Sequence, residues 1–350
     1  ASEEDLPEEL ESILGEAEAA GVRQLRLDWH YRSHHESLIA FSNRQYYDNR
    51  LHTFPAAMAE HPWLGVHWRE VPDGAYDHGK SRTNRKEADA IVAEIVRRLR
   101  DPRQQGNSLG VVTFSVPQQL LVEDLLDVAR GLHPEIEPYL TTVDEPVFVK
   151  NLETVQGDER DVILFSICYG PDTAGNIRMN FGPLNNKGGE RRLNVAITRA
   201  RKQLLVFSTI RPEQIDLSRT KATGVRHLRT FLDYARRGPV ALAEEVTSTG
   251  GEIESPFEQS VFDALSTRGW LLDKQVGCSS YRIDLAIRDR DEPGRYLLGI
   301  ECDGAYYHSA KSARDRDRIR QAVLEGLGWQ LHRVWSTDWW LQRSKEIAKL

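Results

Sequence analysis

Two hydrophobic patterns alternate between about residues 25 and 237. Continuous apolar runs, typical of strands buried on both faces, occur at residues 109–114, 162–168 and 204–208. Apolar positions at helical spacing alternate with these runs, at residues 86–99, 116–129 and 189–200. Strands that alternate with helices predict βαβ units and a mostly parallel sheet. We therefore expect an α/β domain of a kind that often handles nucleotides.

A second series of elements occupies roughly the last hundred residues. A helix is expected from Ser255, followed by strands near residues 271–276, 281–287 and 296–302. A helix over about 310–325, a strand over 329–335 and a final helix complete the series. This order predicts an α/β/α sandwich.

The segment between the two series has the composition of a linker. Residues 247–251 are turn-forming and show no hydrophobic periodicity. We place a linker at 239–254, between one domain at 22–238 and another at 255–350. Residues 1–21 are acidic with apolar positions at helical spacing, which predicts an N-terminal helical segment that continues something absent from this chain.

Composition narrows the classes of protein that the chain can represent. Of 350 residues, 40% are hydrophobic and 28% charged, and no apolar run reaches the roughly 20 residues of a membrane span. We expect a cytoplasmic protein without a membrane partner, because no export signal is recognisable. The three cysteines are far apart and lack C-x-x-C spacing, which argues against a disulfide framework and a zinc site. A net charge of -7 disfavours a pure DNA-binding module, but not a nuclease with metal-binding carboxylates.

Three polar motifs stand in the first domain. They read WHYRSH at 29–34, ETVQGDERD at 153–161 and RRLNVAITRAR at 191–201. In sequence and order they resemble the motifs of superfamily 1 helicases, closest to the Upf-like branch. The resemblance covers roughly residues 27–208 and implies the second RecA-like motor domain of such an enzyme.

The resemblance assigns nucleotide contacts to five residues of these motifs. Arg32 would reach the γ-phosphate of ATP, and Arg199 would be the arginine finger. Gln156, Gly157 and Glu159 would line the nucleotide, with Glu159 on the ribose and Gly157 permitting a tight turn. A guanidinium suits these roles because it stays charged and binds phosphate oxygens in pairs. An ordinary surface arginine or a polar loop remains the alternative for the shorter motifs.

Nucleic-acid contacts are expected from three side chains. Thr154 would face the nucleic acid by resemblance to the family. Thr113 and Gln118 lie in a strand-to-helix element similar to one that holds a single strand in these helicases. Polar side chains at such a place often cap the helix instead.

The stretch Gly74–Ser81 matches the P-loop pattern G-x-x-x-x-G-K-[ST] but lacks its context. A P-loop follows a buried strand and opens directly into a helix. Residues 66–72 alternate polar and apolar positions and end in proline, and the next helix is expected to start later, at a capping box of Asn84 and Glu87. We therefore expect the first motor domain to be absent from this chain, so that ATP would serve only the full-length protein. A complete ATPase that uses Lys80 is the alternative.

Acidic residues lie in or directly after two predicted strands of the second domain. Asp284 lies in YRIDLAI, and Glu301, Asp303 and His308 lie in ECDGAYYH. This pattern resembles the Vsr-like branch of the PD-(D/E)XK nucleases. Glu301 and Asp303 are two apart on a strand and so point to one face. With Asp284 they could hold Mg²⁺ or Mn²⁺, which would activate water beside a phosphodiester.

One position of this site departs from the wider family, since Asp303 stands where that family has lysine. His308 matches a histidine of Vsr-like members and is assigned by that resemblance as general base or leaving-group stabiliser. Glu258 is either a further metal ligand or the partner of Ser255 in a capping box. The alternative for Asp284, Glu301 and Asp303 is that they are surface acids at strand ends without a catalytic role.

The helix after His308 carries several arginines. Arg314 and Arg318 could contact the DNA backbone. Intrahelical ion pairs on a solvated face are an equal alternative.

The preferred hypothesis is a helicase-nuclease fragment that cuts DNA in repair or in defence against foreign DNA. Its partners would be single-stranded or duplex DNA and the absent first RecA-like domain. The alternative is a nuclease fold that has lost activity and serves only as a DNA-binding module, which the missing lysine supports.

Overall fold

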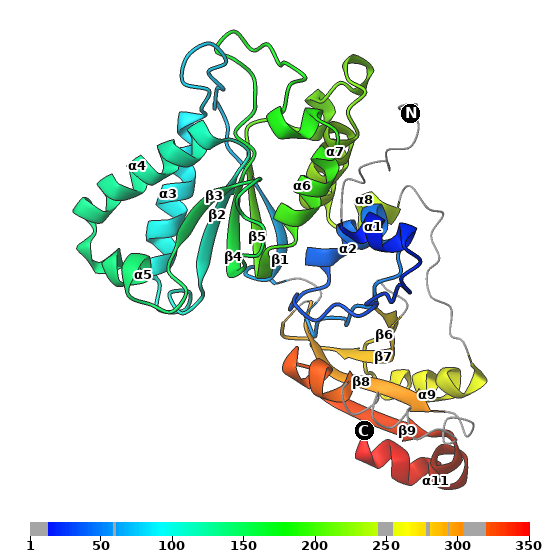
Figure 1. Cartoon of the computed structure of the whole chain (residues 1–350). Helices are drawn as coiled ribbons and strands as arrows, with labels where there is room; N and C mark the ends of the chain where they lie inside the picture. The colour runs from blue at the N-terminus through cyan, green and yellow to red at the C-terminus, as the bar shows by residue number, and fades with distance from the viewer. Residues whose placement is uncertain (1–12, 59–60, 244–254, 278–280, 293, 304–319) are drawn as a thin grey trace, which may run out of the picture.

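The computed structural model describes residues 13–58, 61–243, 255–277, 281–292, 294–303 and 320–350. Two separate sheets organise these residues (Figure 1). No helix among the described residues is long and apolar enough to cross a membrane.

The first sheet is parallel throughout, as the alternating pattern predicts. Its order is β1-β5-β4-β2-β3, and every neighbouring pair runs parallel. All five residues of β2 are buried, which explains its unbroken apolar run. The strands are β1 (Gly65–Glu70), β2 (Leu109–Thr113), β3 (Phe148–Asn151), β4 (Arg160–Ser166) and β5 (Ala200–Ser208).

Helices cover both faces of this sheet (Figure 1). On one face α3 (Arg85–Arg100) and α4 (Val116–Leu132) bury a cluster that includes Ile91, Ile95 and Val122. On the other face α2, α6 and α7 bury a second cluster around Phe41, Leu193 and Phe231. These helices are α2 (Ser37–Tyr46), α6 (Gly189–Ile197) and α7 (Thr223–Arg237), and shorter ones are α1 (Ile13–Ala19), α5 (Glu137–Thr141) and α8 (Val240–Ala243). The predicted α/β architecture is confirmed.

The stretch around the P-loop-like sequence has a different role from a P-loop. The strand before it, β1, lies at the edge of the sheet, and α3 starts only at Arg85. Asn84 caps α3, because its side chain accepts from the Glu87 amide at 3.2 Å. The predicted reciprocal half of this capping box is wrong. The Asn84 amide donates to the Gln118 side chain at 2.8 Å, while Glu87 turns into the protein interior.

The second sheet has the order β6-β7-β8-β9. The first two pairings are antiparallel and the last is parallel. On one face α9 (Pro256–Ser266) and α11 (Ser336–Lys349) pack around Val261, Leu285 and Trp339. The strands are β6 (Leu272–Val276), β7 (Ile283–Arg288), β8 (Tyr296–Asp303) and β9 (Leu331–Trp335). The predicted sandwich order is confirmed for the described elements.

The opposite face of this sheet is covered by two segments. Residues 320–326 are helical and contribute Leu324. Phe54 and Ala57, which precede β1 in the chain, complete the same buried cluster. The first part of the chain therefore supplies part of the core of the second.

Candidate nucleotide-facing and acidic sites

Residues from all three helicase-like motifs meet at the amino ends of β4 and β5. Glu159 directly precedes β4 and Arg199 directly precedes β5. Arg32 donates from Nε to Oε2 of Glu159 at 2.6 Å and from Nη1 to the carbonyl of Thr198 at 3.2 Å. Parallel neighbouring strands place these loops together, so residues far apart in sequence form one corner.

Three guanidinium groups, those of Arg32, Arg199 and Arg201, lie near the carboxylate of Glu159 in this corner. Arg199 is partly buried and donates from Nε to the carbonyl of Val195 at 2.6 Å. Burial and the positive charge of Arg32 lower the pKa of Arg199. An anionic ligand would relieve this repulsion, which is the electrostatic character that a phosphate-facing site requires.

The turn before β4 is open to solvent. Thr154, Gln156 and Gly157 are exposed, and Gly157 has a φ of +94°, with no atom within 4 Å of the place that a β-carbon would occupy. Its left-handed backbone gives the conformational reason for glycine here. The Thr154 hydroxyl serves the turn itself, since it bonds to the Asn151 backbone. Their contacts with nucleotide or nucleic acid stay predictions.

Thr113 and Gln118 require a correction. Both side chains are completely buried, so a nucleic-acid strand cannot reach them in this structure. Thr113 donates to the carbonyl of Ser115 at 2.9 Å, and Gln118 donates to the carbonyl of Asn84 at 3.1 Å. Ser115, not Thr113, caps α4. Hydrogen bonds of these polar side chains therefore join the start of α4 to the sheet and to the start of α3.

Asp284 is the centre of an acidic cluster in the second sheet. It lies on β7 and accepts a hydrogen bond from the Cys302 amide at 2.7 Å. Burial raises its pKa to about 6, and the charges of Glu258, Glu301 and Asp303 act in the same direction. Four predicted site acids are therefore close enough to repel one another electrostatically, which is a property of many functional sites.

Glu301 and Asp303 point to the same face of β8, as their spacing predicts. Both are bound by Arg333 of β9, whose Nη2 lies 2.9 Å from Glu301 Oε2 and whose Nε lies 3.0 Å from Asp303 Oδ2. The Tyr281 hydroxyl donates to the other oxygen of Glu301 at 2.6 Å. Sequence reasoning missed Arg333 and Tyr281, because strand register brings Arg333 opposite Glu301 and no motif announces that pairing.

Glu258 lies at the start of α9 and also acts electrostatically on Asp284, while its role as a metal ligand stays a prediction. Its amide donates to Ser255 Oγ at 3.2 Å, so Ser255 caps α9. Ser255 Oγ donates in turn to Glu258 Oε1 at 3.0 Å, so the Glu258 carboxylate meets the Ser255 hydroxyl. Its side chain is only 7% exposed and also accepts from Gln275 at 3.2 Å. A capping residue can thus still contribute its charge to the cluster around Asp284.

The donor chemistry of this cluster fits a hard divalent cation, because all four groups are carboxylates. Within the part of the chain that the structure describes, no three histidine, cysteine or acidic residues converge as a metal-ligand group. Arg333 instead engages two of the acids. A metal ion would have to draw at least one acid away from it. His308, Arg314 and Arg318 lie outside the described residues.

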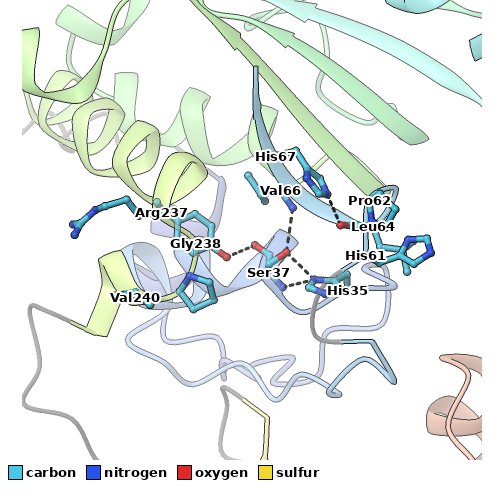
Figure 2. A pocket seen from close by; sticks show the side chains of 12 residues that line it. His35, Ser37, His61, Pro62, Leu64, Val66, His67, Arg237, Gly238 and Val240 are labelled. Carbon is cyan, nitrogen blue, oxygen red and sulfur yellow. Dashed lines mark hydrogen bonds between the residues drawn. The ribbon is translucent and has the colours of Figure 1, made fainter. Parts of the chain in front are cut away.

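A cavity of about 590 Å³ lies beside the start of β1 (Figure 2). Ser37 lines it, and its hydroxyl bonds to His35 Nδ1 at 2.7 Å and accepts from the Val66 amide at 3.1 Å. His61 and His67 also line it. None of the predicted site residues is among its lining residues, so the cavity is separate from both candidate sites.

Two family comparisons divide the chain as the two sheets do. The model of AAA_12, an AAA domain, matches residues 10–211. The chain belongs to this AAA domain family. A second model, the restriction-endonuclease-like REase_MTES_1575, matches residues 257–350. The RecA-like fold is thus followed by a restriction-endonuclease-like fold, as predicted.

Known relatives include helicases. "Uncharacterized ATP-dependent helicase MG140 homolog" of Mycoplasma pneumoniae is 29% identical over 339 residues, which are 93% of this chain and 29% of that protein. "Uncharacterized ATP-dependent helicase MG140" of Mycoplasma genitalium is 30% identical with the same coverage. "DNA polymerase alpha-associated DNA helicase A" of Saccharomyces cerevisiae is 34% identical over 146 residues, 42% of this chain and 18% of that protein. The predicted resemblance to superfamily 1 helicases is confirmed, and the chain spans under a third of each of these relatives.

Proposed function

We propose that the C-terminal part of the chain hydrolyses DNA phosphodiester bonds with the help of Mg²⁺ or Mn²⁺, in the manner of Vsr-like nucleases. The observation that carries this proposal is the gathering of Glu258, Glu301 and Asp303 around the partly buried Asp284. Gathering several like charges in partly buried positions is costly unless a cation is bound. The match to a restriction-endonuclease-like family supports the same chemistry.

Each residue has a distinct role in this proposal. Asp284, Glu301 and Glu258 would hold the metal ion. When bound, such an ion polarises the scissile phosphate and lowers the pKa of a bound water. His308 would accept a proton from the attacking water or stabilise the leaving group. Arg314 and Arg318 would bind the DNA backbone, because their charge suits phosphates.

Arg333 adds a charge that the sequence pattern lacks. Asp303 stands at the position of the family's lysine, and the guanidinium of Arg333 lies 3.0 Å from it. When a metal ion binds Glu301, the guanidinium would turn from that acid towards a phosphate oxygen while it stays beside Asp303. A cation is thus present beside the acids although the usual lysine is not.

We also propose that the first part works as the second motor domain of an ATP-dependent helicase. Arg32 and Arg199 would contact the phosphates of ATP held by a first RecA-like domain elsewhere in the full-length protein, with Glu159 on the ribose. Arg199 would stabilise charge in the transition state. The mycoplasma relatives are named as ATP-dependent helicases, which supports this proposal. Repair and defence against foreign DNA are the processes we propose for the combined enzyme.

A catalytically inactive DNA-binding module is the second candidate. The pairing of Arg333 with both Glu301 and Asp303 favours it, since a protein cation already neutralises these acids.

The two candidates separate in one experiment. The purified chain is incubated with labelled single-stranded and duplex DNA and Mn²⁺, with and without a chelator. The nuclease shortens DNA only when metal is present. A pure binder retards DNA on a native gel and leaves its length unchanged, which would refute the cleavage proposal.

A further inference from the structure

The segment 54–58 of the first part is built into the second sheet. The Tyr296 amide at the start of β8 donates to the carbonyl of Ala57 at 2.9 Å, and Met58 forms an antiparallel bridge with Arg295. The indole of Trp329 donates to the carbonyl of Pro55 at 2.8 Å. Backbone and side-chain hydrogen bonds therefore fix this segment on the nuclease-like sheet.

Phe54 is the side chain of this segment that reaches the acidic cluster, through Tyr281. It is 5% exposed and packs edge-on against Tyr281, with ring centroids 5.7 Å apart. Tyr281 is equally buried, and its hydroxyl donates to Glu301 at 2.6 Å. Edge-to-face pairs of this kind have a preferred geometry, so Phe54 restricts where the Tyr281 ring can lie.

Phe54 also contacts the motif that contains Arg32. Its ring lies 5.1 Å from that of Trp29 and 6.0 Å from that of Tyr31. Tyr31 is the neighbour of Arg32, which bonds to Glu159. A continuous series of contacts thus runs from the nucleotide-facing corner through Phe54 and Tyr281 to Glu301.

We propose that Tyr281 is a positioning residue for Glu301 and that Phe54, from the helicase-like part, holds Tyr281 in place. The nucleotide-facing segment of the motor part thereby sets the orientation of a nuclease acid. This inference rests on the proposed metal-dependent nuclease. Arg333 binds the other oxygen of Glu301, so Tyr281 and Arg333 together fix both oxygens of this carboxylate.

The test uses the whole chain and two readouts, Mn²⁺ binding by calorimetry and cleavage of labelled duplex DNA. Tyr281→Phe removes only the hydroxyl and should weaken Mn²⁺ binding about tenfold, as losing an outer-shell partner typically does. Tyr296→Phe is the matched control, because that hydroxyl donates at 2.8 Å to Asp273 on the same sheet, outside the acidic cluster. It should bind Mn²⁺ like the wild type.

Phe54 is tested by graded substitutions. Phe54→Leu should weaken Mn²⁺ binding less than Phe54→Ala does. Phe54→Tyr keeps an aromatic ring and should bind Mn²⁺ nearly as tightly as the wild type. Combining Phe54→Leu with Tyr281→Phe should add nothing beyond Tyr281→Phe alone, because coupled residues are not additive. Thermal unfolding of each variant identifies any loss of fold, and Phe54→Leu keeps the test valid if Phe54→Ala does not fold.

The outcomes separate this inference from the function on which it rests. Undiminished cleavage by Asp284→Asn would refute the proposed nuclease. Loss of cleavage in Asp284→Asn with wild-type Mn²⁺ binding by Tyr281→Phe would overturn the positioning role alone. Full additivity of the Phe54 and Tyr281 substitutions would overturn the claim that Phe54 acts through Tyr281.

Discussion

Glu87 shows how a single buried carboxyl group can set the pH dependence of the whole protein. It is completely buried and accepts hydrogen bonds from Ser166 Oγ and from the Cys168 amide, both at 2.6 Å. Burial raises its pKa to about 8, so the folded protein holds this proton where the unfolded chain has lost it. Its contribution to stability is therefore complete below the unfolded pKa and is lost as the pH rises towards 8.

We expect Glu87→Gln to remove this dependence. The amide oxygen can accept the same two hydrogen bonds without acquiring charge. The difference in the free energy of unfolding between variant and wild type should grow from pH 5 to pH 8, reaching about 1–3 kcal/mol in favour of the variant. Denaturant unfolding across this range measures it, with Asp89→Asn on the exposed side of α3 as the control. A constant difference would contradict the account.

At the scale of single residues, the sequence indicated which residues to consider better than it indicated their contacts. The charged residues of the helicase-like motifs and the acids of the second sheet were singled out by resemblance to known families, and their ligand contacts stay predictions. Gln118 was expected to contact nucleic acid, because a polar residue after a strand gives no sign that it will bond to Asn84. Arg333 and Tyr281 were missed because their roles depend on which strands and segments become neighbours.

Among the elements, β2 depends on a glycine for its pairing with β3. Gly110 lies opposite Phe148, and a side-chain carbon at Gly110 would come within 2.5 Å of that ring. The ring is held in turn by Arg160, whose guanidinium lies 4.8 Å from its centroid. The ring thus has little freedom to move aside.

Gly110→Ala should destabilise the protein by about 1–3 kcal/mol, because it overpacks this strand pair. Gly131→Ala is the matched comparison. It lies in α4 with open space around it, so alanine there should stabilise by about 0.5–1 kcal/mol. Thermal unfolding of both variants measures the difference. Equal effects would show that the close approach of Phe148 is not the reason for glycine at this position.

Hydrophobic periodicity correctly predicted the type and order of most elements, and most predicted bounds lie within a few residues of the observed ones, but the helices α2 and α7 were not predicted. The edge strand β1 was not identified because it lacks the apolar run of a central strand, although alternating polarity is typical of a half-exposed one. β3 was also missed, since it has only four residues and none of the strong apolar run of β2. Local patterns identify the central strands more readily than the edges.

At the scale of the whole molecule, the contact between the two parts could not be predicted from their separate patterns.

Trp329 is 3% exposed and bonds to Pro55, which is also buried. Trp329→Phe keeps an aromatic ring but leaves a buried carbonyl unpaired, at a cost of about 1–3 kcal/mol. Hydrogen exchange of the Tyr296 amide should become faster, whereas Trp340→Phe at a 60% exposed position should leave it unchanged. An unaltered exchange rate in Trp329→Phe would argue against a core that residues 54–57 share with the second sheet.

The chain should hydrolyse no ATP on its own. Lys80 lies in an exposed turn after an edge strand, so it lacks the surroundings of a P-loop lysine. Phosphate release by the chain should stay at background, and Lys80→Ala should not change it. Turnover that disappears in Lys80→Ala would support the complete ATPase instead.

The central claim is that the acids around Asp284 cut DNA with a divalent metal ion. The most direct measurement compares the cleavage rate of a labelled duplex by wild type, Asp284→Asn and Asp291→Asn in Mn²⁺. Asp291 is an exposed acid in the turn that precedes β8 and serves as the control. We expect Asp284→Asn to lose at least about a hundredfold in rate, or ~2.7 kcal/mol, while Asp291→Asn cuts like the wild type. Equal rates for all three proteins would contradict the account.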